Sequence, residues 1–167
     1  MIVDLKELYH EQLREILCAK SQMVATLPEY SRLAGSRQLR DVLNRHLSVT
    51  RAQRQQLLDL LAGHGLDHGS DEFRPMRGLI RGAKLQLART LTGPVREAVL
   101  IASAIRLEHL EIACCESGRL SATRLGLDDD AQVLLECLLE DHEAVEKLTT
   151  TGTESISPEA SHPVAHA

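Results

Sequence analysis

Aromatic residues are scarce in this chain: it has no Trp, one Phe and two Tyr among 167 residues. A core without them must be built from Leu, Ile, Val and Ala, which favours packing of helix against helix. No run reaches the roughly 18 apolar residues of a membrane span, and acids begin at Asp4, unlike a signal peptide. The composition therefore predicts an all-α protein with no membrane association.

Basic residues are outnumbered, and cysteines do not occur in a recognisable motif. The chain has 19 Lys and Arg against 24 Asp and Glu, a net charge of −5 that argues against a nucleic-acid partner. No nucleotide fingerprint, phosphate loop or nucleophile with a matching base is visible. The four cysteines, which lack CxxC or zinc-site spacing, are Cys18, Cys114, Cys115 and Cys137. We therefore expect them to be reduced thiols and the protein to be cytoplasmic.

Apolar residues recur at helical spacing in five segments. This spacing predicts helices over residues 3–27, 37–61, 76–91, 94–118 and 128–148, the first ending at Pro28 and the fourth at Gly118. Four long helices with a shorter one between the second and third indicate an antiparallel bundle with a crossover helix over residues 1–148. Residues 149–167 are rich in Ser, Thr, Pro and Ala, which predicts a disordered tail.

Polar residues interrupt the inward faces of these helices. Lys20 lies on the apolar face of the first helix, and His46 and Gln53 lie on that of the second. A lysine in this position either extends its ammonium to solvent along the apolar face or pairs with an acid inside the bundle. A single histidine on an apolar face is more often a hydrogen-bonded core residue than a metal ligand.

Four acids form the candidate metal site. Glu108 and Glu111 are three residues apart on one predicted helix, and Glu140 and Asp141 lie on the next. Carboxylates with this spacing can converge on a hard cation. A di-iron bundle site also takes acids from the other two helices, together with histidines. The sequence therefore supplies only part of such a site.

These segments resemble the YciE/YciF family of bacterial stress proteins. The resemblance covers roughly residues 3–148 and is most specific in VREAVLIASAIRLEHLEIA, with further similarity in MRGLI, in HL followed by TRAQ, and in LLECLLEDHEAVEKL. It implies a ferritin-like four-helix bundle with a crossover helix, a dimer, and a carboxylate-rich metal site. In that site Glu108 and Glu111 match the glutamates of the EHxEIA motif, and Glu140 and Asp141 match paired acids.

The chain departs from the family pattern at three places. Lys20 in AKSQM replaces a glutamate of AEKQL, and Ser48 and Val49 in HLSVT replace both glutamates of HLEET. An acid of the crossover segment is replaced by Gly82 or Arg81. Losing these carboxylates while gaining an ammonium removes about three negative charges, so a di-iron centre is not expected.

Three interpretations of the interior follow. In the first, Lys20 neutralises Glu108 with help from Asp141, and this ion pair replaces the metal. In the second, Lys20 reaches solvent and Glu108 is hydrated or bonded to His46 or Gln53. In the third, Glu108, Glu111, Glu140 and Asp141 hold one iron or other divalent ion.

The expected function is that of a non-catalytic stress-response protein with a partly lost di-metal site. It would act as a homodimer or through a partner protein, without a cofactor. One alternative is a metal-dependent ferroxidase or peroxidase that uses the acids of the last two helices. Another is a cargo or adaptor protein that docks through residues 149–167.

Overall fold

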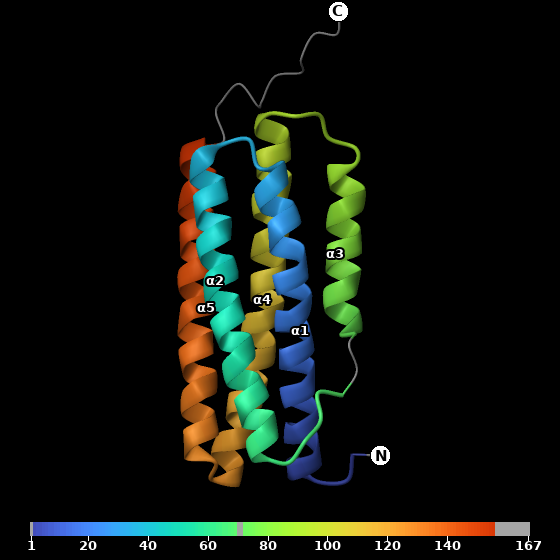
Figure 1. Cartoon of the computed structure of the whole chain (residues 1–167), viewed down its shortest axis with the longest axis vertical. Coiled ribbons are helices and arrows are strands. Elements are labelled where there is room, and N and C mark those ends of the chain that lie inside the picture. Colours follow the sequence, from blue (N-terminus) through green and yellow to red (C-terminus); the bar gives the residue numbers. More distant parts are fainter. Residues whose placement is uncertain (1, 70–71, 156–167) are drawn as a thin grey trace, which may run out of the picture.

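The computed structural model describes residues 2–69 and 72–155, and this part of the chain is helical, without strands (Figure 1). It contains five helices: α1 (Leu5–Leu33), α2 (Arg37–Gly63), α3 (Arg74–Leu87), α4 (Pro94–Leu125) and α5 (Asp128–Ser155). The expected all-α class is confirmed. No helix among the described residues combines the length and apolar character needed to cross a membrane.

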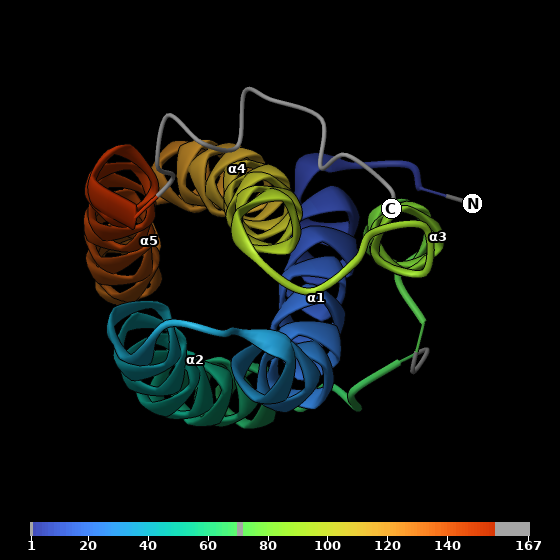
Figure 2. The same ribbon diagram turned by 90° about the horizontal axis from the view of Figure 1, so that it is seen from above.

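The four long helices surround a shared interior. Viewed along their axes, α1, α2, α5 and α4 follow one another around a ring, and α3 lies outside it beside α1 and α4 (Figure 2). Neighbours in the ring run in opposite directions because α3 carries the chain back along the molecule before α4 begins (Figure 1). Consequently α1 lies diagonally opposite α5, and α2 lies diagonally opposite α4.

Local signals set most helix ends. The Asp4 side chain accepts a hydrogen bond from the Glu7 N–H at the start of α1, and Ser36 does the same for Leu39 at the start of α2. At the other end of α4, Gly126 has φ +71°, the left-handed conformation that glycine adopts readily at a helix end.

The predicted ends of the first and fourth helices are wrong, and the short helix α3 ends at Leu87 rather than at residue 91. Pro28 lies inside α1, which continues to Leu33, and Gly118 lies inside α4, which continues to Leu125. A Cβ at residue 118 would lie 2.9 Å from Ile16 Cδ1, so this glycine allows α1 to approach α4 closely. Its role is in packing rather than helix termination.

The last helix also extends beyond its predicted end at Leu148. It reaches Ser155, which places residues 149–155 of the predicted tail in α5. Thr151 is buried, at 3% exposure. The boundary at residue 148 is therefore wrong, and residues 156–167 of the predicted tail lie outside the described part of the chain.

The hydrophobic core is split into two clusters. One surrounds Met23, Leu43 and Leu100, and the other surrounds Leu13, Leu57 and Leu134. Between them lies a set of buried polar side chains, which we call the central polar layer. Its members are Lys20, His46, Gln53, Glu108, Glu111 and Asp141.

Candidate functional site

The central polar layer draws residues from all four long helices. Lys20 comes from α1, His46 and Gln53 from α2, Glu108 and Glu111 from α4, and Asp141 from α5. Each follows an apolar neighbour one helical turn away, so the amphipathic pattern that buries the core also turns these polar groups inward. His46 is 5% exposed, and the other five are completely buried.

Lys20 spans the diagonal of the bundle from α1 to α5. Its Nζ donates hydrogen bonds to both Asp141 carboxylate oxygens at 2.7 and 2.8 Å, and to Glu111 Oε2 at 3.3 Å. Complete burial of Lys20 excludes the interpretation in which its ammonium reaches solvent. Its carboxylate partners are Asp141 and Glu111, whereas the first interpretation paired it with Glu108 and Asp141.

The charges in this layer depend on the two acids beside Lys20. Burial disfavours the charged ammonium, but Glu111 and Asp141 outweigh that effect, so the pKa of Lys20 lies well above its usual value. Burial raises the pKa of Glu111 well above the ordinary range, although Lys20 opposes the shift. Both groups therefore hold their protons more tightly than the same side chains do in water.

His46 spans the other diagonal, from α2 to α4. Its Nε2 lies 2.5 Å from Glu108 Oε1, and Thr50 Oγ1 lies 3.5 Å from the same nitrogen. Neither carboxylate oxygen of Glu108 has a hydrogen-bond partner, and the close contact with His46 is an ion pair when the imidazole is protonated. The layer thus places His46 beside Glu108, the contact considered in the second interpretation.

Gln53 connects the layer to the surface between α2 and α5. Its Nε2 donates to Asp141 Oδ1 and Glu140 Oε2, each at 3.0 Å, and lies 3.3 Å from the Cys137 carbonyl oxygen. Glu140 is exposed, unlike the other three predicted metal ligands. The structure therefore does not bring the four predicted acids together around one point.

One group of three metal-binding side chains does converge within the described residues. Ligand atoms of His46, Glu108 and Glu111 all lie within 4.8 Å of one another. The prediction included both glutamates but treated His46 only as a neighbour of the site. Its position on the inward face of α2 was the available signal, but the sequence does not show which acid it faces across the bundle.

The layer does not fit a di-metal centre. Two divalent ions in a helical bundle use about four carboxylates along with histidines. Here Asp141 accepts three hydrogen bonds from Lys20 and Gln53, and the Lys20 ammonium lies between Asp141 and Glu111. Two divalent ions would face that ammonium at close range, and Asp141 is already engaged by Lys20 and Gln53.

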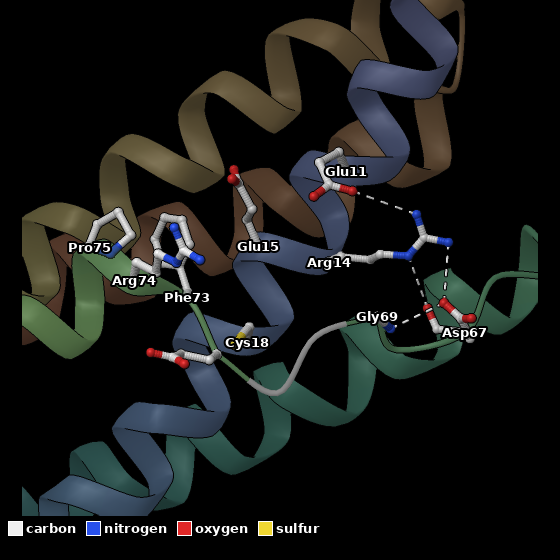
Figure 3. Close-up of a pocket in the computed structure, with 10 residues that line it drawn as sticks. Glu11, Arg14, Glu15, Cys18, Asp67, Gly69, Phe73, Arg74 and Pro75 are labelled. Carbon is white, nitrogen blue, oxygen red and sulfur yellow. Dashed lines mark hydrogen bonds and ion pairs between the residues drawn. The ribbon is translucent and has the colours of Figure 1, made fainter. Parts of the chain in front are cut away.

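A separate cavity of about 460 Å³ lies between α1 and the segment that leads into α3 (Figure 3). Arg14 points across its mouth and forms ion pairs with Glu11 and Asp67 at 3.8 and 3.3 Å. None of the predicted site residues lines it. We therefore regard the central polar layer as the candidate functional site.

Together these features define an all-helical protein with a buried layer of charged residues in its core. A protein family described as a domain of unknown function, DUF892, matches residues 4–161. The chain belongs to this family, which confirms the YciE/YciF resemblance.

The individual relatives agree with this assignment. The chain is 26% identical to Protein YciF of Escherichia coli (strain K12) over 157 residues, covering 93% of this chain and 95% of that protein. The crystal structure of the E. coli stress protein YciF matches with a TM-score of 0.86 and 25% identity, covering 93% of this chain and 98% of that one. YcfI of Rhodopseudomonas palustris, to which a structural role is ascribed, matches with a TM-score of 0.85 and 30% identity over 89% of this chain and 95% of its own.

Proposed function

We propose that this protein is a YciF-type stress-response protein with a structural role and no catalytic one. In this proposal the chain is a ferritin-like bundle in which an internal ion pair replaces part of a lost di-metal centre. The observation that carries it is the buried Lys20 ammonium, 2.7 Å from Asp141 and 3.3 Å from Glu111. Support for the stress connection comes from E. coli YciF, which is described as a stress protein.

Electrostatics supports the replacement. A di-iron protein activates oxygen at two adjacent cations, each held by carboxylates that offset its charge. In this chain the Lys20 ammonium takes the place of one of the two metal cations. A lysine side chain cannot change oxidation state, so it cannot take part in oxygen activation. Asp141 is fully engaged by Lys20 and Gln53, so it has no role left as a metal ligand.

We further propose that the protein acts as a homodimer or together with a protein partner. Three large apolar side chains are exposed where α3 leads into α4: Leu85, Leu91 and Val95, at 61%, 72% and 52%. Exposed apolar groups that lie near one another often mark an interaction surface.

Metal analysis and oxygen consumption test the proposed loss of the di-metal centre. Protein purified without chelator is expected to contain fewer than two metal ions per chain and to cause no Fe²⁺-dependent oxygen uptake above that of the buffer. The variant Lys20→Glu, which restores the acid of the family pattern, is the matched comparison and is expected to bind more metal. Two iron ions per chain with oxygen uptake in the unmodified protein would instead support the ferroxidase or peroxidase alternative.

A further inference from the structure

We propose that copies of this protein bind one another head to tail, with a basic face of α3 in one copy against an acidic face of α5 in the next. The partner of both faces is thus a second copy of the same chain. The inference goes beyond the proposed function, because it does not depend on whether the central polar layer holds a metal ion.

Basic residues are concentrated in α3 and in its connection to α4. Residues 73–96 contain six Lys and Arg and no Asp or Glu, although the whole chain has a net charge of −5. The buried residues of α3 are Met76, Ala83 and Leu87, so its opposite side faces solvent. Residues three, four or seven apart share a helix face. The α3 basic face defined in this way consists of the exposed residues Arg74, Arg77, Arg81 and Lys84.

Acidic residues dominate the outward side of α5. This helix contains nine Asp and Glu and one Lys. The same spacing of three, four and seven residues connects a set of exposed acids along it. The α5 acidic face consists of Asp129, Glu136, Glu140 and Glu143. The two faces therefore carry opposite charge, which favours their association and disfavours contact of either face with a copy of itself.

The spacing of charges on the two faces matches. Arg74 and Arg81 are seven residues apart, as are Glu136 and Glu143. At a rise of about 1.5 Å per residue, each pair spans about 10 Å along its helix. Two such helices lying side by side can therefore form both ion pairs together.

Each face also has an exposed leucine on or beside it. Leu85 of α3 is 61% exposed, and Leu139 of α5 is 60% exposed. A Cβ added to Gly78 or Gly82 of α3 would meet no described atom within 4 Å. These glycines leave the α3 backbone open to close approach by another helix. Contact between the two faces would thus bury apolar surface within a charged rim, as is usual in protein interfaces.

The positions of the two helices determine the kind of assembly. In both views α3 and α5 lie on opposite sides of the molecule, with the other helices between them (Figures 1 and 2). Two rigid copies therefore cannot pair both faces with each other at once. Every added copy leaves one α3 face and one α5 face available, and such contacts build a ring or an open array rather than a closed dimer.

The average mass of the full chain in solution tests this contact, and sedimentation velocity measures it. We expect the mass to rise with protein concentration at about 0.01 M salt and to fall to one or two chains at about 1 M, because the Debye length shortens from about 30 Å to about 3 Å. A mass of one or two chains under every condition would overturn the contact and leave the proposed function standing.

Two charge-reversal variants identify the surfaces. Arg74→Glu with Arg81→Glu makes the α3 face acidic, and Glu136→Arg with Glu143→Arg makes the α5 face basic. Each variant alone should lose the low-salt assembly, because its two faces then carry charge of the same sign. An equimolar mixture of the two variants should regain assembly, because each basic face again meets an acidic one.

The matched control is Arg51→Glu with Arg124→Glu, at exposed positions of α2 and α4. It changes the net charge as much as the α3 variant does and should assemble like the unmodified protein, with circular dichroism as the folding check for every variant. Failure of the mixture to assemble would overturn the pairing of α3 with α5. Binding of the unmodified protein to anionic phospholipid vesicles without self-association, lost in the α3 variant, would overturn it in favour of a membrane surface.

Discussion

At the scale of single residues, Lys20 shows how a charged side chain can be kept in a bundle core. Its ammonium makes three hydrogen bonds to two carboxylates, and the Gln53 amide donates to one of the same oxygens. Such a group costs several kcal/mol to desolvate, a cost that its partners offset only while all of them are present. Lys20 and Asp141 should therefore be energetically coupled.

Replacing Lys20 with Met should destabilise the protein by about 3–5 kcal/mol, because Asp141 would remain buried without its ammonium. The double variant Lys20→Met with Asp141→Leu should recover much of that loss, since both charges are then removed. Urea unfolding measures both changes.

Lys147→Met serves as the surface control, because its ion pair with Glu143 is exposed and should leave the unfolding midpoint unchanged. Equal stability of the single and double core variants would contradict the coupling between Lys20 and Asp141.

The sequence predicts which residues form the central polar layer better than it predicts which of them bond to one another. Helical spacing placed Lys20, Gln53, Glu108 and Asp141 on inward faces, and all four are buried. Partners across a bundle depend on how each helix is rotated and on its height along the axis, and a single sequence specifies neither within one turn. For this reason the first interpretation pairs Lys20 with Glu108 and Asp141, whereas its ammonium is bonded to Glu111 and Asp141.

At the scale of helices, periodicity predicted all five segments, but local end signals misled at two points. Proline and glycine commonly end helices, yet α1 continues past Pro28 and α4 continues past Gly118. Ile16 of α1 packs closely against Gly118 of α4. This tertiary contact favours the continuation of α4 past the glycine. The interior of each helix was therefore predictable from sequence, whereas these ends were not.

The start of α2 depends on a residue of α4 that the sequence did not indicate. Glu97 is 6% exposed and accepts hydrogen bonds from the backbone N–H groups of Gly35 and Ser36 and from the Ser36 hydroxyl. In sequence it looks like an ordinary acid in the first turn of a helix, where it would complement the helix dipole. Its carboxylate instead joins the connection between α1 and α2 to α4.

Glu97→Ala should therefore destabilise the protein by about 1–3 kcal/mol, because three donors lose a buried acceptor. Glu97→Gln keeps one acceptor oxygen and should lie between that variant and the unmodified protein. Thermal unfolding followed by circular dichroism measures the order of the three proteins. Glu97→Ala unfolding at the same temperature as the unmodified protein would show that solvent replaces these contacts at no cost.

At the scale of the whole molecule, polar contacts also connect three helices at the end opposite this connection. Tyr9 of α1 donates to Asp130 Oδ2 at 2.7 Å, and His64 Nε2 at the end of α2 lies 2.6 Å from the same oxygen of α5. The rings of His10 and His64 are 5.3 Å apart. This end of the bundle therefore contains two histidines that would repel each other when both are protonated.

Acid should weaken this end. Burial lowers the pKa of His10 below 6.5, and the charges of His64, Lys6 and Arg14 act in the same direction, against a smaller opposing effect of Asp4. The unfolded chain then binds the His10 proton more readily, so the free energy of unfolding should fall as the pH drops below about 6.5. Urea unfolding can be measured between about pH 7.5 and about pH 5, the range in which histidine titrates. The free energy of unfolding should fall less steeply with decreasing pH for His10→Gln than for the unmodified protein. Identical slopes would exclude this contribution.

The two diagonals of the polar layer bear on how the chain is assembled. Lys20 with Asp141 and His46 with Glu108 each join a helix of the α1–α2 hairpin to a helix of the α4–α5 hairpin. Each hairpin alone would carry unmatched charged groups on its apolar face, and only the other hairpin supplies their counterparts. The two halves are thus complementary in polarity as well as in shape, which disfavours pairing either hairpin with a copy of itself.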